Sequence, residues 1–213
     1  MKKNLTEMVF ILDRSGSMGG LESDTVGGFN AMIEKQKKAE GDAYVSTVLF
    51  NTHSKVLHDR VDVRQIRPMT QDDYCVGGCT ALLDAVGDAI HHIGNVHKYA
   101  RPEDVPEKTV FVITTDGMEN ASHRYTYDKV RRMIEKEKEK YGWEFIFLGA
   151  NIDAVETAAR IGIQADRAAN FVADGAGADA TFASVNEAVR RVRNNAPMNA
   201  EWRAAVDADY RRR

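Results

Sequence analysis

The chain has 213 residues, of which 43% are hydrophobic and 29% charged, and its formal net charge is −3. This balance is typical of a globular protein and excludes a disordered chain, and the charge gives no support to a nucleic-acid partner. No apolar run reaches the roughly 18 residues that a membrane span requires. The apolar run after the two N-terminal lysines is too short for a secretory signal. We therefore expect a cytoplasmic protein of one domain.

Strand and helix patterns alternate along nearly the whole chain. Short apolar or β-branched runs predict strands at 8–12, 43–50, 55–63, 109–115, 143–150 and 169–172. Apolar residues at helical spacing predict helices at 24–40, within 77–96, and at 126–141, 154–161 and 180–193. Ser23 or Asp24 is placed to cap the first helix, and Thr126 the third. The alternation predicts a doubly wound, mostly parallel sheet with helices on both faces. The more polar segment 55–63 is expected to form a short antiparallel edge strand.

The C-terminal end differs in composition from the rest. Pro197 interrupts the last helical pattern, and the polar, Arg-rich segment that follows ends in "YRRR". We therefore expect an α/β domain at residues 1–195 and an extension at 196–213. A charged end of this kind is usually solvated, so neither nucleic acid nor a membrane is expected as a partner.

Three predicted loops carry short side chains that end in oxygen. The first holds Asp13, Ser15 and Ser17, the second Thr80, and the third Asp116. In open α/β sheets, ligands bind outside the carboxyl ends of the strands, which is where the first and third loops begin. Two carboxylates and three hydroxyls are hard oxygen donors, which suit Mg²⁺ or Mn²⁺ and suit zinc poorly. The pattern predicts a magnesium site at this edge of the sheet.

These loops resemble the metal-ion-dependent adhesion site of von Willebrand factor A domains. That site is written D-x-S-x-S after the first strand, followed by a threonine and an aspartate in two later loops, and the resemblance extends from Met8 to about Arg193. It implies direct metal contact through Ser15, Ser17 and Thr80. Asp13 and Asp116 would contact the ion directly or through water. The resemblance also implies an open coordination position for an Asp or Glu of a partner protein, and no catalysis. Bacterial intracellular relatives often belong to larger assemblies, some with AAA+ ATPases.

The charges of the expected ligands favour such an open position. Two carboxylates neutralise one divalent ion, and the three hydroxyls add no charge. A further carboxylate is therefore still attracted to the ion, whereas five acidic ligands would repel it. Gly16, between the two serines, is expected to allow backbone angles that other residues resist.

Each part of the pattern also has a plainer interpretation. Ser15 and Ser17 are common turn residues, Thr80 is a common helix cap, and Asp116 precedes a glycine in a common turn dipeptide. The complete set, in this order and after these elements, favours the metal site. A degenerate site that no longer binds metal is the alternative.

Two other functions, a phosphatase and a dinucleotide-binding protein, are less well supported by the sequence. A phosphatase of the haloacid dehalogenase type also starts with a strand ending in aspartate, but it needs a general acid two residues later, where this chain has Ser15. The sequence "GAGADA" at 175–180 fits part of a dinucleotide fingerprint. No further strand with a ribose-binding acid follows its helix, so we interpret this segment as a flexible turn.

Several residues near the three loops are candidates for lesser roles. Cys75 and Cys79 form a single C-x-x-x-C pair, which lacks the second ligand pair of a zinc site. We expect free thiols, with a disulfide that displaces the Thr80 loop as the alternative. Other candidates for the rim of the site are Asn51, Glu119, Asn120 and His123. Adjacent His91 and His92 point to different faces of a helix and form no metal pair.

Overall fold

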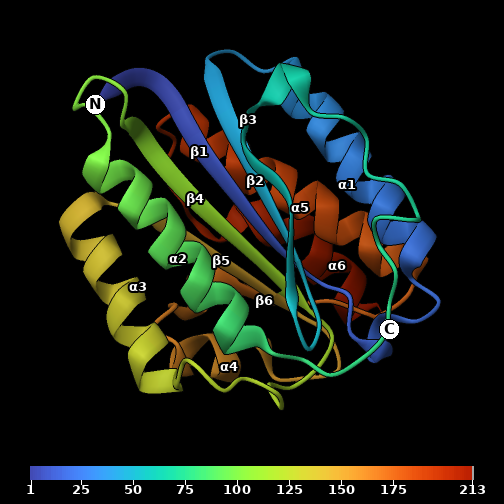
Figure 1. Ribbon diagram of the computed structural model, residues 1–213. Helices are drawn as coiled ribbons and strands as arrows, with labels where there is room; N and C mark the ends of the chain where they lie inside the picture. The colour runs from blue at the N-terminus through green and yellow to red at the C-terminus, as the bar shows by residue number, and fades with distance from the viewer. Residues whose placement is uncertain (213) are drawn as a thin grey trace.

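The computed structural model describes residues 1–212 and contains a six-stranded sheet of order β3-β2-β1-β4-β5-β6 (Figure 1). The strands are β1 (Lys2–Asp13), β2 (Asp42–Phe50), β3 (Ser54–Asp62), β4 (Pro106–Thr115), β5 (Glu144–Gly149) and β6 (Ala168–Asn170). Neighbouring strands pair in parallel except β2 and β3, which are antiparallel. The predicted mostly parallel sheet and its antiparallel edge strand are thus confirmed. The winding direction reverses between β1 and β4, and the carboxyl ends of these two strands border the crevice where open sheets bind ligands.

Helices cover both faces of the sheet. They are α1 (Glu22–Lys37), α2 (Leu82–Tyr99), α3 (Tyr127–Tyr141), α4 (Ala154–Arg160), α5 (Gly175–Arg193) and α6 (Ala204–Arg211). Short 3-10 helices are η1 (Gly16–Met18), η2 (Val63–Gln65), η3 (Ala165–Arg167) and η4 (Ala200–Arg203). The helices α1, α5 and α6 pack on one face, and α2, α3 and α4 pack on the other (Figure 1). None of the helices within residues 1–212 has the length and apolar composition that a bilayer span needs.

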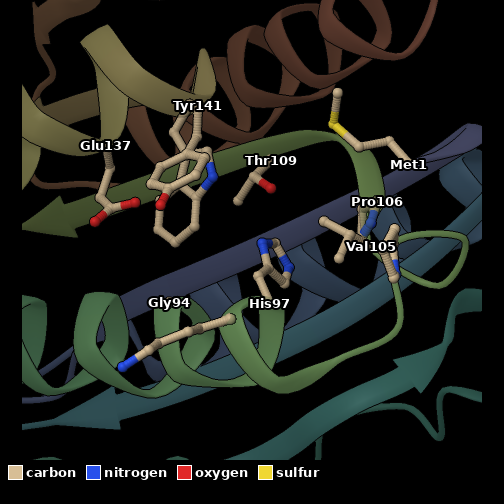
Figure 2. A pocket seen from close by; sticks show the side chains of 11 residues that line it. Met1, Gly94, His97, Val105, Pro106, Thr109, Glu137 and Tyr141 are labelled. Carbon is tan, nitrogen blue, oxygen red and sulfur yellow. The ribbon is translucent and has the colours of Figure 1, made fainter.

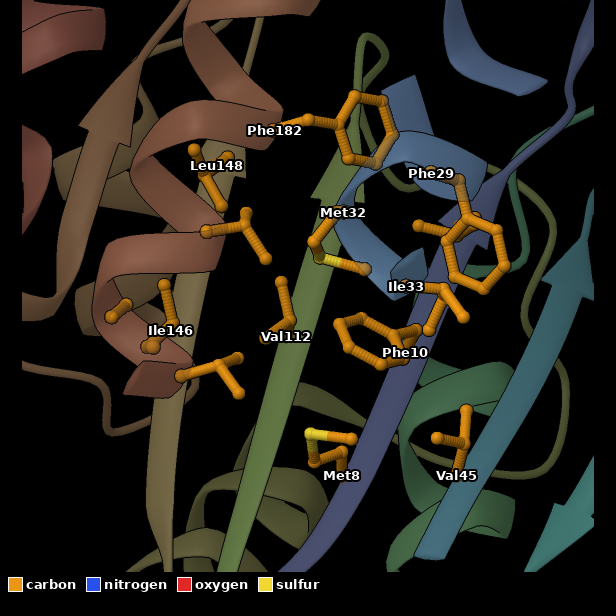
Figure 3. Close-up of a cluster of buried hydrophobic side chains, with 14 of the residues drawn as sticks. Met8, Phe10, Phe29, Met32, Ile33, Val45, Val112, Ile146, Leu148 and Phe182 are labelled. Atoms are coloured by element: carbon orange, nitrogen blue, oxygen red, sulfur yellow. The ribbon is translucent and has the colours of Figure 1, made fainter. Parts of the chain in front are cut away.

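Two hydrophobic clusters fill the layers because strand side chains alternate between the faces of the sheet. Phe10 and Leu12 of β1 belong to the cluster under α1 and α5, whereas Val9 and Ile11 belong to the cluster under α2 and α3. Figure 3 shows the first cluster, in which the Phe10 ring meets the Phe29 ring edge to face at a centroid distance of 5.6 Å. These buried strands are the apolar runs seen in the sequence.

Two helix starts differ from the expectation. Leu21 is the N-cap of α1, so Ser23 and Asp24 both lie inside the helix and neither caps it. The segment 175–180 is the first part of α5 and not a flexible turn, because the Asp174 side chain accepts a hydrogen bond from Gly177 N at 2.9 Å and caps the helix. By contrast, Thr126 caps α3 as predicted, accepting from Lys129 N.

Residues of the expected C-terminal extension pack against the main core. The segment η4 and the helix α6 lie along α5, and Trp202 and Val206 are completely buried within the cluster on that face. The indole Nε1 of Trp202 donates a hydrogen bond to the carbonyl of Asp166 at 2.9 Å. This part of the chain contributes apolar area to the core although its overall composition is polar.

Candidate functional site

The three oxygen-bearing loops meet at the carboxyl edge of the sheet. Asp13 is the last residue of β1, and Asp116 follows the neighbouring strand β4 directly. Thr80 lies on the segment that leads into α2 and is hydrogen-bonded to the Asp116 loop. Since β1 and β4 are adjacent and parallel, their ends bring the two carboxylates to the same place.

Hydrogen bonds link four of the predicted residues into a chain. Asp13 Oδ1 accepts from the backbone N–H of Ser15 at 2.7 Å. The hydroxyls of Ser15 and Ser17 are 3.1 Å apart, and Ser17 Oγ donates to Asp116 Oδ1 at 2.5 Å. The one-residue spacing in D-x-S-x-S therefore lets a single loop contact both carboxylates.

Thr80 joins this group from the second loop. A Cβ placed on Gly117 would lie 3.2 Å from Thr80 Oγ1 and 3.3 Å from Ser17 Oγ, so both hydroxyls crowd the same glycine. A larger residue at position 117 would push these hydroxyls away. All five predicted site residues thus belong to one cluster, although only four are joined by direct hydrogen bonds.

Two of the predicted rim residues connect neighbouring loops through hydrogen bonds. Asn120 makes a reciprocal pair with Thr80: Thr80 N donates to Asn120 Oδ1 at 2.9 Å, and Asn120 N donates to the Thr80 carbonyl at 3.0 Å. Asn51 donates from Nδ2 to the carbonyl of Gly77 at 2.7 Å and accepts from Ala81 N at its own carbonyl. These contacts fix the segment that carries Thr80 from both sides.

The backbone freedom expected at Gly16 is found instead at Gly77 and Gly78. These two have φ angles of 148° and 77°, while Gly16 is not among the residues with positive φ and begins η1. A side chain at Gly78 would come within 2.7 Å of Thr52 Oγ1. The tight reversal lies before Thr80, where the Gly78 carbonyl accepts a hydrogen bond from Gly16 N at 3.1 Å.

Both carboxylates are buried, Asp13 at 1% exposure and Asp116 at 2%. Burial raises the pKa of Asp13, although the hydrogen bonds from Thr115 and Ser15 oppose this effect. Burial also raises the pKa of Asp116, against the hydrogen bond from Ser17. Asp116 Oδ2 is buried and has no hydrogen-bond partner among residues 1–212. The site therefore combines two buried carboxyl groups with one carboxyl oxygen that has no partner in the described chain.

Two further residues fix Asp13, and neither was predicted. Thr115 Oγ1 donates to Asp13 Oδ2 at 2.5 Å, and the buried Tyr74 hydroxyl donates to the Asp13 carbonyl. The position of Thr115 next to Asp116 in "TTDG" is a signal that could have identified it. Tyr74 lies in an irregular segment far from Asp13 in sequence, and no local pattern marks it.

The remaining candidates have structural contacts. Glu119 accepts hydrogen bonds from Leu83 N and from the Ser122 hydroxyl, and His123 donates through its backbone N–H to Asp84. His92 pairs with Asp59 at the surface. Cys75 and Cys79 are exposed free thiols.

The donor set suits a hard cation. Within the part of the chain that the structure describes, no group of three or more His, Cys, Asp or Glu side chains is arranged to hold a metal. The cluster at Asp13 is not such a group, because only two of its five side chains are carboxylates and the other three are hydroxyls. Two carboxylates with serine and threonine hydroxyls match the oxygen preference of Mg²⁺ and Mn²⁺ and lack the imidazole and thiolate ligands that zinc favours.

Comparisons with known proteins support the fold through solved structures. No family model and no curated protein matches the chain. The PilB minor pilin from Streptococcus sanguinis is similar with a TM-score of 0.62 and 12% identity, over 87% of this chain and 61% of its own. A von Willebrand factor type A protein from Catenulispora acidiphila is similar with a TM-score of 0.59 and 15% identity, over 87% of this chain and 42% of its own. Proximal thread matrix protein 1 from the mussel byssus, with a zinc-occupied MIDAS motif, is similar with a TM-score of 0.51 and 14% identity. The match covers 78% of this chain and 41% of that structure.

These similarities lie below the identity at which function transfers, and they concern the fold. The chain spans between 41% and 61% of the length of these three structures. The chain has a von Willebrand A-like α/β fold.

Proposed function

We propose that this chain is a metal-dependent protein-binding module. In this proposal a Mg²⁺ ion, or Mn²⁺, is held by Asp13, Ser15, Ser17, Thr80 and Asp116. An Asp or Glu side chain of a partner protein occupies the coordination position left open. The setting we propose is a larger assembly in the bacterial cytoplasm, such as one with an AAA+ ATPase.

The proposal rests on the two buried carboxyl groups of the cluster, one of which has an oxygen without a hydrogen-bond partner. Two buried carboxylates lie close to three hydroxyls, and Asp116 Oδ2 has no hydrogen-bond partner among residues 1–212. Burying carboxylates without an opposite charge is unfavourable by several kcal/mol. A divalent cation offsets this energy, and hydroxyl oxygens complete its ligand shell.

The same charges indicate what kind of partner group would bind. With one divalent ion the two carboxylates bring the site to neutrality, so a third carboxylate meets no net repulsion. Ser17 is exposed while Asp13, Ser15, Thr80 and Asp116 are buried. A partner group therefore approaches from the side of Ser17, where the cluster opens to solvent.

We propose binding without turnover. A phosphatase of the kind that uses a strand-end aspartate needs an acidic group two residues later, and Ser15 at this position contacts Ser17. No contact in the described chain favours that alternative. A phosphate-release assay with p-nitrophenyl phosphate and Mg²⁺ separates the two, and turnover above a metal-free control would contradict the binding proposal.

The test of metal binding uses Asp116→Asn, which keeps the shape of the side chain and removes its charge. We expect Mn²⁺ titration calorimetry to show loss of binding in this variant, and capture of partner proteins to become insensitive to Mg²⁺ and chelator. Asp179→Asn, which removes an exposed carboxylate on α5, is the matched control and leaves both unchanged. Normal Mn²⁺ binding by Asp116→Asn contradicts the assignment.

A further inference from the structure

A second cavity lies at the opposite end of the sheet from Asp13. It has a volume of about 320 Å³ and is enclosed by the last turns of α2 and α3 and by the beginning of β4 (Figure 2). Apolar side chains form most of its wall, among them Met1, Val105, Pro106, Tyr141 and Trp143. Its volume falls within the range of sites that bind small molecules, roughly 300–1,000 Å³.

Three polar side chains face this apolar cavity, one from each surrounding element. Glu137 comes from α3, His97 from α2 and Thr109 from β4, and Figure 2 shows them around the same space. Glu137 and Thr109 are 6% and 3% exposed. Glu137 Oε1 pairs with Lys136 at 3.1 Å. Neither Glu137 Oε2 nor the Thr109 hydroxyl is among the buried polar atoms that lack a partner within residues 1–212.

The hydrogen bonding of His97 fixes which of its nitrogens is free. Its Nε2 lies 3.4 Å from Oε2 of Glu7, a completely buried carboxylate that also pairs with Arg60 Nε at 2.8 Å. The other ring nitrogen, Nδ1, has no partner in the described chain.

The cavity presents one carboxylate, that of Glu137, among largely apolar walls. Lys98 also lines it, and its ammonium lies over the exposed Tyr99 ring, 4.9 Å from the centroid. Met1, which carries the α-amino group, lines the cavity as well, and the Lys136 ammonium is exposed and paired with Glu137. The indole of Trp143 supplies a large apolar wall, and aromatic faces attract ammonium groups as well.

From this arrangement we infer that the cavity is a binding site for a small primary amine with an apolar or aromatic body. The ammonium group donates to Glu137, with Thr109 and His97 within the same cavity as further acceptors. The body of the ligand packs against Trp143. This site shares no residue with the cluster at Asp13, and the inference holds whether or not that cluster binds metal.

The probe is 2-phenylethylamine, compared with neutral 2-phenylethanol and anionic 3-phenylpropanoate. The chain has two tryptophans, so the indole N–H signals in an NMR titration report two places. Trp143 lines the cavity, whereas Trp202 lies in the core cluster on the other face of the sheet. We expect 2-phenylethylamine to shift the Trp143 signal saturably and leave that of Trp202 in place. We expect the neutral and anionic probes to bind at least about tenfold more weakly, because a hydrogen bond between charged groups is lost.

Two variants and a control complete the test. Glu137→Gln removes the carboxylate charge and should lower the affinity for 2-phenylethylamine about tenfold or more. Gly94→Leu places a side chain in the cavity from α2, where a Cβ would be in ordinary van der Waals contact with Trp143 at 4.0 Å, and should abolish binding. Glu139→Gln, on the exposed face of α3, should bind as the parent does. The inference is overturned if 2-phenylethylamine gives no saturable shift, if 3-phenylpropanoate binds equally well, or if Glu137→Gln with an unchanged unfolding transition keeps full affinity.

Discussion

The reciprocal hydrogen bonds between Asn120 and Thr80 give a sharp test of how the site is positioned. Asn120→Ala removes the acceptor of the Thr80 N–H and leaves the bond from Asn120 N to the Thr80 carbonyl in place. No proposed metal ligand is touched. If the pair positions the Thr80 hydroxyl relative to Asp116, its loss weakens metal binding while the fold persists.

The expected size follows from burial. Thr80 is 3% exposed, so its orphaned N–H lowers the free energy of unfolding by about 1–3 kcal/mol. The loop retains the Asn51 contacts on its other side, which limits the displacement. Loss of a group that orients a metal ligand typically weakens metal affinity by about 10–100-fold, and we expect a loss in this range.

The assay is Mn²⁺ titration calorimetry, paired with urea unfolding of the metal-free protein. Asn120→Asp keeps an acceptor at the same place and should retain most of the affinity that Asn120→Ala loses. An Asn120→Ala variant that is less stable but binds Mn²⁺ as tightly as the parent refutes the positioning role. In that case the bond supports the fold alone.

Two further predictions concern pH and the C-terminal residues. Because burial raises the folded-state pKa of Asp13 and Asp116, the folded metal-free protein holds these protons more tightly than the unfolded chain. The contribution of these two carboxyls to stability should therefore fall as pH rises from the unfolded value near 3.8 through the raised folded values, and Mg²⁺ should reverse this loss. Urea unfolding at each pH with chelator and with Mg²⁺ measures the effect, and a stabilisation by Mg²⁺ that does not grow with pH in this window contradicts the prediction. Trp202→Ala should lower the free energy of unfolding by about 3–5 kcal/mol, because its ring is completely buried; a loss below about 0.5 kcal/mol in the same assay would show that this segment is not part of the core.

The fold was predictable because its central elements repeat local patterns. The strands β1, β4 and β5 contain continuous apolar runs, and such runs mark strands that are covered on both faces. The start of β1 was missed because Lys2, Lys3 and Glu7 make its first part polar. That part pairs with β2 and β4, and Glu7 is buried there with Arg60 as its partner. Pairing along the backbone does not depend on hydrophobicity, so the composition could not reveal it.

The proximity of the five candidate ligands was predictable because their loops follow or precede elements that the sequence identifies. Their supporting contacts were not. Thr115 and Tyr74 reach Asp13 across sequence separations of 102 and 61 residues. The role of Asn120 depends on the distance between two loops. Such contacts follow from tertiary packing, and apart from the position of Thr115 next to Asp116 the sequence contains no local signal for them.

The helix α2 relates the two ends of the molecule. Thr80 precedes its first turn, and His97 lies in its last turn beside the second cavity. A helix of 18 residues is about 27 Å long, while charges in physiological salt are screened over about 8 Å. A cation at Asp13 therefore has little electrostatic effect on an amine at Glu137. Any dependence of one ligand on the other would have to be transmitted by movement of α2. Equal affinity for 2-phenylethylamine with and without Mg²⁺ would show that α2 keeps its position when the metal binds.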